Sequence, residues 1–194
     1  MHICKKKNMT QDQHIDRLID ETNKILNKAI LLKEEDLDTL NYKPSPNKWS
    51  ALECIEHLNL YGDFYLPEIE KQMAEAKPTQ KNNYKSGVLG NYLVQSMLPK
   101  GGTVKKMKTF KDKDPAGSQL SLASIDRFIE QQKHLIQLLR QSKQLDTMKV
   151  KTKTTIPLIR LRLGDTFHFV VNHHIRHWLQ LEKAIQSKHE HYDQ

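Results

Sequence analysis

Three histidines of this sequence could together bind a divalent metal ion. His173 and His177 are four residues apart, which on a helix places both imidazoles on one face about one turn apart, close enough to share an ion. A third imidazole, that of His57, would come from a facing helix and complete a set of three neutral nitrogen ligands. Three protein ligands leave coordination positions open for water or substrate, which is typical of a reactive metal centre.

The same histidines could instead be packing residues whose ring nitrogens are hydrogen-bonded. At about 100° per residue, His174 falls nearer the middle of the apolar arc of its helix than His173 and His177 do. Helical phase therefore leaves His174 open as a ligand. The histidines elsewhere are scattered or close to the chain ends and indicate no site by themselves: His2, His14, His134, His189 and His191.

Four long amphipathic helices are predicted to position these side chains. The first has Thr10 as its N-cap and carries apolar residues at three- and four-residue steps as far as about Leu32. The second begins after Ser50, which would form a capping box with Glu53, and stops near Pro78. His57 lies in the middle of this second helix.

The second half of the chain supplies the other two long helices, expected over residues 118–142 and from residue 161 or 165 to residue 187. Between the two pairs lies a long crossover, residues 78–117, with a short helix at 88–97. Residues 148–156 are interpreted as a loop because Pro157 interrupts any strand there. This order favours an all-α fold, a four-helix bundle with one long crossover connection and an extra short helix.

Length and composition favour one cytoplasmic domain. The 194 residues are expected to form a single bundle, residues 1–194, with residues 1–9 as a flexible N-terminal segment. No apolar run approaches the roughly 18–20 residues that cross a bilayer, and the first residues lack the apolar core of a secretory signal. Two cysteines without a CxxC pattern suit a reducing compartment.

The net charge of +8 is concentrated in three lysine-rich stretches, residues 5–7, 100–113 and 149–162. Such stretches could attract phosphate, but they are more typical of a solvated surface. The sequence has no helix-turn-helix or zinc-finger spacing and little aromatic interleaving, so we expect no nucleic-acid partner. We also expect no membrane partner, because no segment could span a bilayer.

Two segments resemble a known family. Residues 46–58, Pro-Asn-Lys-Trp-Ser-Ala-Leu-Glu-Cys-Ile-Glu-His-Leu, are similar to the proline, tryptophan and first-histidine segment of the DinB-like four-helix metalloproteins. Residues 173–180, His-His-Ile-Arg-His-Trp-Leu-Gln, are similar to their closing His-x-x-Arg-His motif. The likeness covers most of the chain in helix order but is specific at these two segments.

The resemblance implies a ligand set and a class of chemistry. His57, His173 and His177 match the ligand positions of the family, whereas His168 and His174 match none. The implied cofactor is one divalent ion, nickel or zinc, and the family includes metal-dependent transferases that join a small thiol to an electrophile. We expect small-molecule thiol or electrophile partners and a homodimer.

Two other functions stay open, a metal-dependent hydrolase and a non-catalytic metal-binding or stress-response protein. A hydrolase would use a carboxylate base near the metal, and the residues available beside His57 are Glu53 and Glu56. Cys54 is interpreted as a buried small hydrophobe rather than a ligand. Arg176 and Gln180 of the closing motif could bind substrate or be structural, with Arg176 pairing with a carboxylate on a neighbouring helix. Trp49 is interpreted as a packing anchor at the helix entrance.

Overall fold

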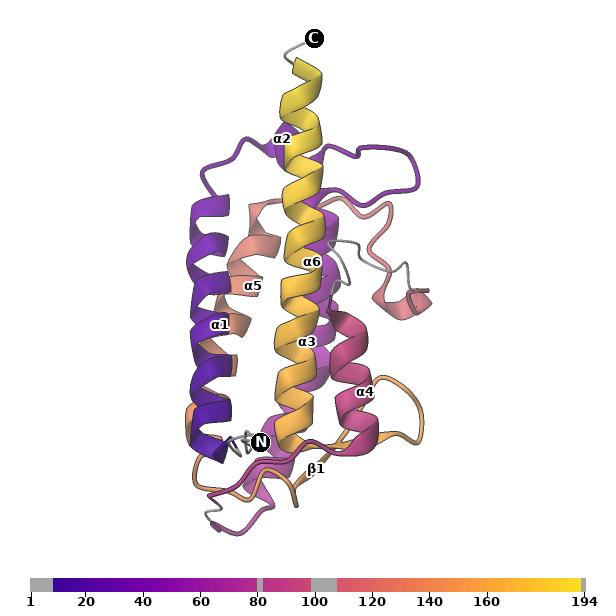
Figure 1. The fold of residues 1–194 in the computed structure, drawn as a ribbon. Helices are drawn as coiled ribbons and strands as arrows, with labels where there is room; N and C mark the ends of the chain where they lie inside the picture. The colour runs from indigo at the N-terminus through magenta and orange to yellow at the C-terminus, as the bar shows by residue number, and fades with distance from the viewer. Residues whose placement is uncertain (1–8, 80–81, 99–107, 193–194) are drawn as a thin grey trace, which may run out of the picture.

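Four long helices lie alongside one another in the structure, a computed structural model that describes residues 9–79, 82–98 and 108–192 (Figure 1). The long helices are α1 (Gln11–Leu32), α3 (Ala51–Ala74), α5 (Leu122–Ser142) and α6 (Leu163–Tyr192). Shorter helices are α2 (Leu37–Asn41), α4 (Val88–Met97) and the 3-10 turn η1 (Lys111–Lys113). The predicted all-α class is confirmed. Within the described ranges, no helix is both long and apolar enough to cross a membrane.

The long helices pack in the order α1, α5, α3, α6, with α6 returning to contact α1 along a shorter interface. Their apolar faces meet in two continuous core clusters. The first surrounds Phe167 and Tyr65, and the second surrounds Phe128 and Leu52, all fully buried. This packing brings the middle of α3 against the middle of α6, the two helices that carry the candidate ligands.

Side-chain hydrogen bonds cap the N-termini of α1 and α3 at the residues that the sequence predicted. The Thr10 and Ser50 side chains each accept from the backbone N–H three residues later, at 3.1 Å, and Gln13 and Glu53 complete two capping boxes. Such a cap is worth about 0.5–2 kcal/mol. Helix α4 has the predicted bounds, whereas α5 begins at Leu122, four residues later than expected, with Ser121 as its N-cap.

Residues 151–153 form a strand, so the interpretation of 148–156 as a loop was wrong for them. Strand β1 (Lys151–Lys153) pairs antiparallel with β2 (Arg160–Arg162) in a hairpin that leads directly into α6. Pro157 lies in the connection between the strands, where no backbone N–H is needed for strand pairing. Thr152 and Leu161 face inward and are buried.

The crossover is anchored beside the first turns of α1 and α6. Tyr84 N–H donates to the Met9 carbonyl at 3.2 Å, which links the backbone of the crossover to the residues just before α1. The buried Asp165 carboxylate of α6 accepts from the Tyr84 hydroxyl at 2.7 Å and from Gly87 N–H at 2.9 Å. These bonds hold the start of α4 against α6. The expected flexible segment lies, apart from Met9, outside the described residues.

Candidate metal centre

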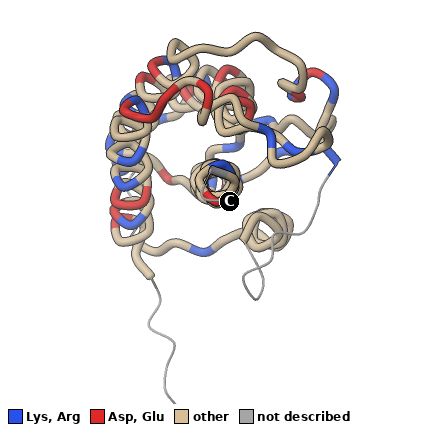
Figure 2. The backbone as a smooth tube through the Cα atoms, turned by 90° about the horizontal axis from the view of Figure 1, so that it is seen from above, with Lys and Arg blue, Asp and Glu red and all other residues tan. Residues whose placement is uncertain are grey.

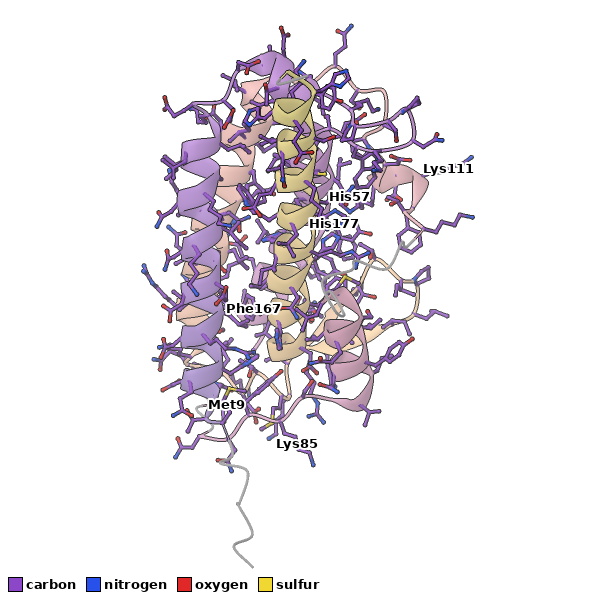
Figure 3. The ribbon with its side chains drawn as sticks, turned by 45° about the horizontal axis from the view of Figure 1, so that its top comes forward. Met9, His57, Lys85, Lys111, Phe167 and His177 are labelled. Carbon is purple, nitrogen blue, oxygen red and sulfur yellow. The ribbon has the colours of Figure 1, made fainter. Side chains whose placement is uncertain are left out.

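The structure brings His57, His173 and His177 together between α3 and α6. One ring nitrogen from each lies within 4.8 Å of the others, and all three side chains are buried. Figure 3 shows His57 and His177 next to each other in the upper half of the bundle. Among the described residues, no other group of histidine, cysteine and carboxylate side chains converges in this way.

The orientation of His57 is fixed by a backbone carbonyl. Its Nδ1 lies 2.7 Å from the Lys113 carbonyl oxygen, which can only accept, so Nδ1 carries the proton. Nε2 of the neutral ring therefore presents its lone pair to Nε2 of His173, which lies 3.2 Å away, within hydrogen-bond distance. A histidine that donates one N–H to a carbonyl and presents its other nitrogen to the site is the usual arrangement of a metal ligand.

The spacing of the closest pair of ring nitrogens fits a divalent ion, and the three ligand atoms all lie within 4.8 Å of one another. An ion with tetrahedral bonds of about 2.0–2.1 Å separates its nitrogen ligands by about 3.3 Å, close to the spacing between His57 and His173. Nδ1 of His177 is buried and has no hydrogen-bond partner within the described part of the chain. A set of three imidazoles suits zinc, nickel or copper better than magnesium or calcium.

All three imidazoles are neutral near pH 7. Burial lowers the pKa of His57 to about 4. Burial also lowers the pKa of His173 and His177 well below the usual value, and the neighbouring histidines lower it further. Because a histidine must be deprotonated to bind metal, the site is already in its binding form at neutral pH.

Aromatic rings flank the histidines on two sides. The Trp49 ring centroid lies 4.6 Å from that of His57 and 5.8 Å from that of His177. Tyr61, one turn after His57 on α3, lies 4.9 Å from His57 and 4.5 Å from His173. Trp49 packs at the helix entrance as predicted, but it also forms one wall of the site.

The other motif residues lie close by. Arg176 is buried, burial lowers its pKa, and its charge helps to lower the pKa of all three histidines. A hydrogen bond with the Gln180 side chain raises the pKa of His177 and so partly offsets the effect of burial. Arg176 therefore adds positive potential at the site, which favours an anionic ligand.

The carboxylates nearest in sequence to His57 are engaged elsewhere. Glu53 accepts from Ser50 N–H at 2.9 Å, from the Lys43 ammonium at 2.8 Å and from Gly117 N–H at 3.2 Å. Glu56 accepts from the Arg127 guanidinium at 3.2 Å and from Asn59. Glu53 thereby ties the segment containing Lys113, the partner of His57, to the start of α3.

Cys54, also beside His57 in sequence, lies in the core. The side chain is fully buried, and burial raises the pKa of its thiol. It packs within the same apolar cluster as Phe128 and Leu52. The interpretation as a small buried hydrophobe agrees with this position.

His174 and His168 point away from the cluster. The His174 ring packs edge-on to Phe128 of α5, with centroids 5.4 Å apart, and burial lowers its pKa to about 3. His168 lies one helical turn before the site and contacts His14 of α1 and the Arg17 guanidinium. His173 and His174 thus differ in the neighbouring helix that each ring faces, α3 for His173 and α5 for His174.

A second histidine cluster escaped the sequence analysis. His14 is fully buried, its Nε2–H donates to the Gly164 carbonyl at 3.2 Å, and its ring stacks on Tyr84 with centroids 3.7 Å apart. The spacing of His14 with other histidines gave no signal, because its contacts come from the crossover and from α6. The Lys113 carbonyl was missed for a related reason, since a backbone atom of an irregular segment leaves no pattern in the sequence.

The model of the DinB superfamily matches residues 14–181, which include all three converging histidines and both resembling segments. No curated protein and no solved structure matches the chain with significance.

Proposed function

Because the chain belongs to the DinB superfamily, we propose that it binds one divalent ion through His57, His173 and His177 and transfers a small thiol to an electrophile. The observation that carries the proposal is the convergence of three buried, neutral imidazoles from α3 and α6. Nickel and zinc are the ions that suit these ligands best. A cytoplasmic location and a homodimer are part of the same proposal.

A bound divalent cation would stabilise a thiolate and lower the pKa of the thiol. In the transfer, the thiolate sulfur forms a bond to the electrophilic carbon, the leaving group departs with its bonding electrons, and the thiol proton goes to solvent. The residues of the chain supply the surroundings. Arg176 adds positive charge, and Trp49 and Tyr61 form apolar walls beside the histidines.

The hydrolase alternative has less support. It would draw its base from Glu53 or Glu56, but both carboxylates already accept hydrogen bonds from other groups. A base must reach the attacking water within about 2.6–3.2 Å. The non-catalytic alternative differs from the proposal in activity alone and is separated from it by assay.

The first test is metal content. Tag-free wild type should hold about one divalent ion per chain by elemental analysis, and His57→Ala and His173→Ala should not. His174→Ala is the matched control, because it removes an equally buried imidazole from the same helix turn and should keep the metal. Wild type that stays metal-free after reloading with nickel or zinc would contradict the proposal.

The second test is conjugation. Loaded wild type should accelerate the reaction of a low-molecular-weight thiol with a chloronitrobenzene, and His57→Ala should not. Loaded protein that is inactive with every cellular thiol, yet keeps its metal, would favour the non-catalytic alternative. Size-exclusion chromatography with light scattering tests the homodimer separately.

A further inference from the structure

The outward face of the β1–β2 hairpin is entirely cationic. The register pairs Lys151 with Arg162 and Lys153 with Arg160, so each outward position on one strand faces a like charge on the other. Like charges directly opposite each other destabilise a sheet. By contrast, Figure 2 shows Lys and Arg interleaved with Asp and Glu along α1. The hairpin therefore has an arrangement that an anionic partner would stabilise.

The positive surface continues beyond the strands. The Arg162 guanidinium donates to the carbonyl of Lys85 at 2.7 Å and lies beside Gly87, at the start of α4. The Lys85 side chain is exposed and projects from the lower end of the molecule (Figure 3). Carboxylates border the patch at Glu68, Glu75, Asp146 and Asp165. That of Glu68 accepts from Lys153 N–H, those of Glu75 and Asp146 line a pocket together with Lys151, and that of Asp165 accepts from Gly87 N–H.

An apolar tip projects from this cationic hairpin. Leu158 is fully exposed, with a relative exposure of 103%, in the left-handed conformation at φ 64°, which is uncommon for a leucine. Ile156 and Pro157 beside it are also exposed. On the neighbouring α4, Val88 and Tyr92 are exposed as well, at 93% and 69%. Figure 1 places the hairpin connection and α4 on the same side of the bundle.

We propose that the hairpin and the start of α4 form a docking surface for an anionic lipid bilayer. Lysines and arginines attract the negative headgroups, while Leu158, Ile156 and Val88 enter the boundary between headgroups and acyl chains. A nucleic acid would satisfy the charges but would leave the aliphatic tip exposed to water. The bilayer accounts for both features of the surface.

This proposal concerns attachment to one face of a membrane, and it replaces the expectation of no membrane partner, which rested on the absence of a spanning segment. It does not depend on the metal site. The three histidines and the hairpin belong to separate parts of the molecule, so either proposal can fail without the other.

Vesicle sedimentation tests the proposal. The full chain should bind vesicles of mixed phosphatidylglycerol and phosphatidylcholine at low salt, and should bind pure phosphatidylcholine weakly. Lys151→Gln with Lys153→Gln should weaken binding about 25-fold, from about fivefold for each charge near the surface. Leu158→Ser with Ile156→Ser should weaken binding without changing its dependence on salt.

The matched control removes two charges elsewhere, Lys24→Gln with Lys183→Gln, both exposed on α1 and α6. It should bind vesicles as wild type does. Equal weakening in the control would mean that net charge alone drives binding and would overturn the proposal. Absence of binding to anionic vesicles, or binding to RNA that exceeds binding to vesicles, would overturn it too. Unchanged circular dichroism in each variant shows that the fold is retained.

Discussion

The molecule contains two buried histidine clusters that differ in where their ring nitrogens point. In the upper cluster, His57, His173 and His177 direct nitrogens toward one another. In the lower cluster, His14 donates to the Gly164 carbonyl and His168 accepts from the Arg17 guanidinium. Burial lowers the pKa of histidines in both clusters. Burial and a lowered pKa therefore do not distinguish a metal centre from a packing network, whereas the convergence of three ring nitrogens does.

The lower cluster joins three elements of the fold through polar contacts. The Tyr84 ring stacks on His14 with an interplanar angle of 8°, and its hydroxyl donates to Asp165. The crossover, α1 and α6 thus meet at one set of polar contacts. In the upper cluster, the contact from His57 to the Lys113 carbonyl orients a lone pair into the site.

The largest expected effect separates the clusters by metal content. His173→Ala should abolish stoichiometric binding of nickel or zinc, because it removes one of three nitrogen ligands. His14→Ala should leave binding intact. Elemental analysis after loading and desalting gives both values. Loss of metal in both variants would mean that the lower cluster supports the site, and retention in both would remove His173 from the ligand set.

The loss of unfolding free energy should be larger for the lower cluster than for the upper cluster, opposite to the order for metal content. His14→Ala leaves the Gly164 carbonyl without its donor and creates a cavity at a fully buried position, so we expect a loss of about 2–4 kcal/mol in unfolding free energy. His173→Ala, measured without metal, should cost less because it also relieves the close approach of three imidazoles. Urea unfolding of both variants in a chelator checks the difference. A smaller loss for His14→Ala than for His173→Ala would contradict it.

Acid should destabilise the protein through these histidines. Burial lowers the pKa of His14 to about 4, so between the unfolded value of about 6.5 and about 4 the unfolded chain binds a proton that the folded chain does not. Stability is therefore fully present above about pH 6.5 and decreases as the pH falls, by up to about 1.4 kcal/mol per unit for each such histidine.

His14→Gln tests this dependence, because an amide can still donate to Gly164 but does not titrate. Its unfolding free energy, measured in urea between about pH 5 and 7, should fall less steeply than that of wild type. Equal slopes for the two proteins would show that His14 is protonated in the folded state or contributes no net proton uptake.

The smallest expected effect concerns the support of His57. Glu53→Gln should weaken metal binding about tenfold, the lower end of the range for groups that position a ligand, because it loosens the Gly117 contact near Lys113. Competition with a chromophoric chelator measures the affinity, and the cobalt spectrum reports ligand geometry. The control is Glu56→Gln, which alters a contact to Arg127 and should leave the affinity unchanged.

The sequence by itself determined the features that depend on near neighbours. Thr10 and Ser50 cap helices through residues three positions later, and the four-residue spacing of His173 and His177 places them on one helical face. A hydrogen bond within one turn needs no other element, so its sequence pattern is sufficient. His57 was identified through its resemblance to a family motif, a match that the superfamily model supports.

Only the tertiary structure decided the features that depend on distant partners. His173 and His174 are adjacent and both buried, and they separate because one ring faces α3 and the other faces Phe128 of α5. The Lys113 carbonyl that orients His57 lies 56 residues along the chain. The hairpin is stabilised because the paired residues Thr152 and Leu161 are buried on its inner face, against the helices. Such contacts follow from how whole helices pack, since a short window of sequence does not specify which helix a side chain will face.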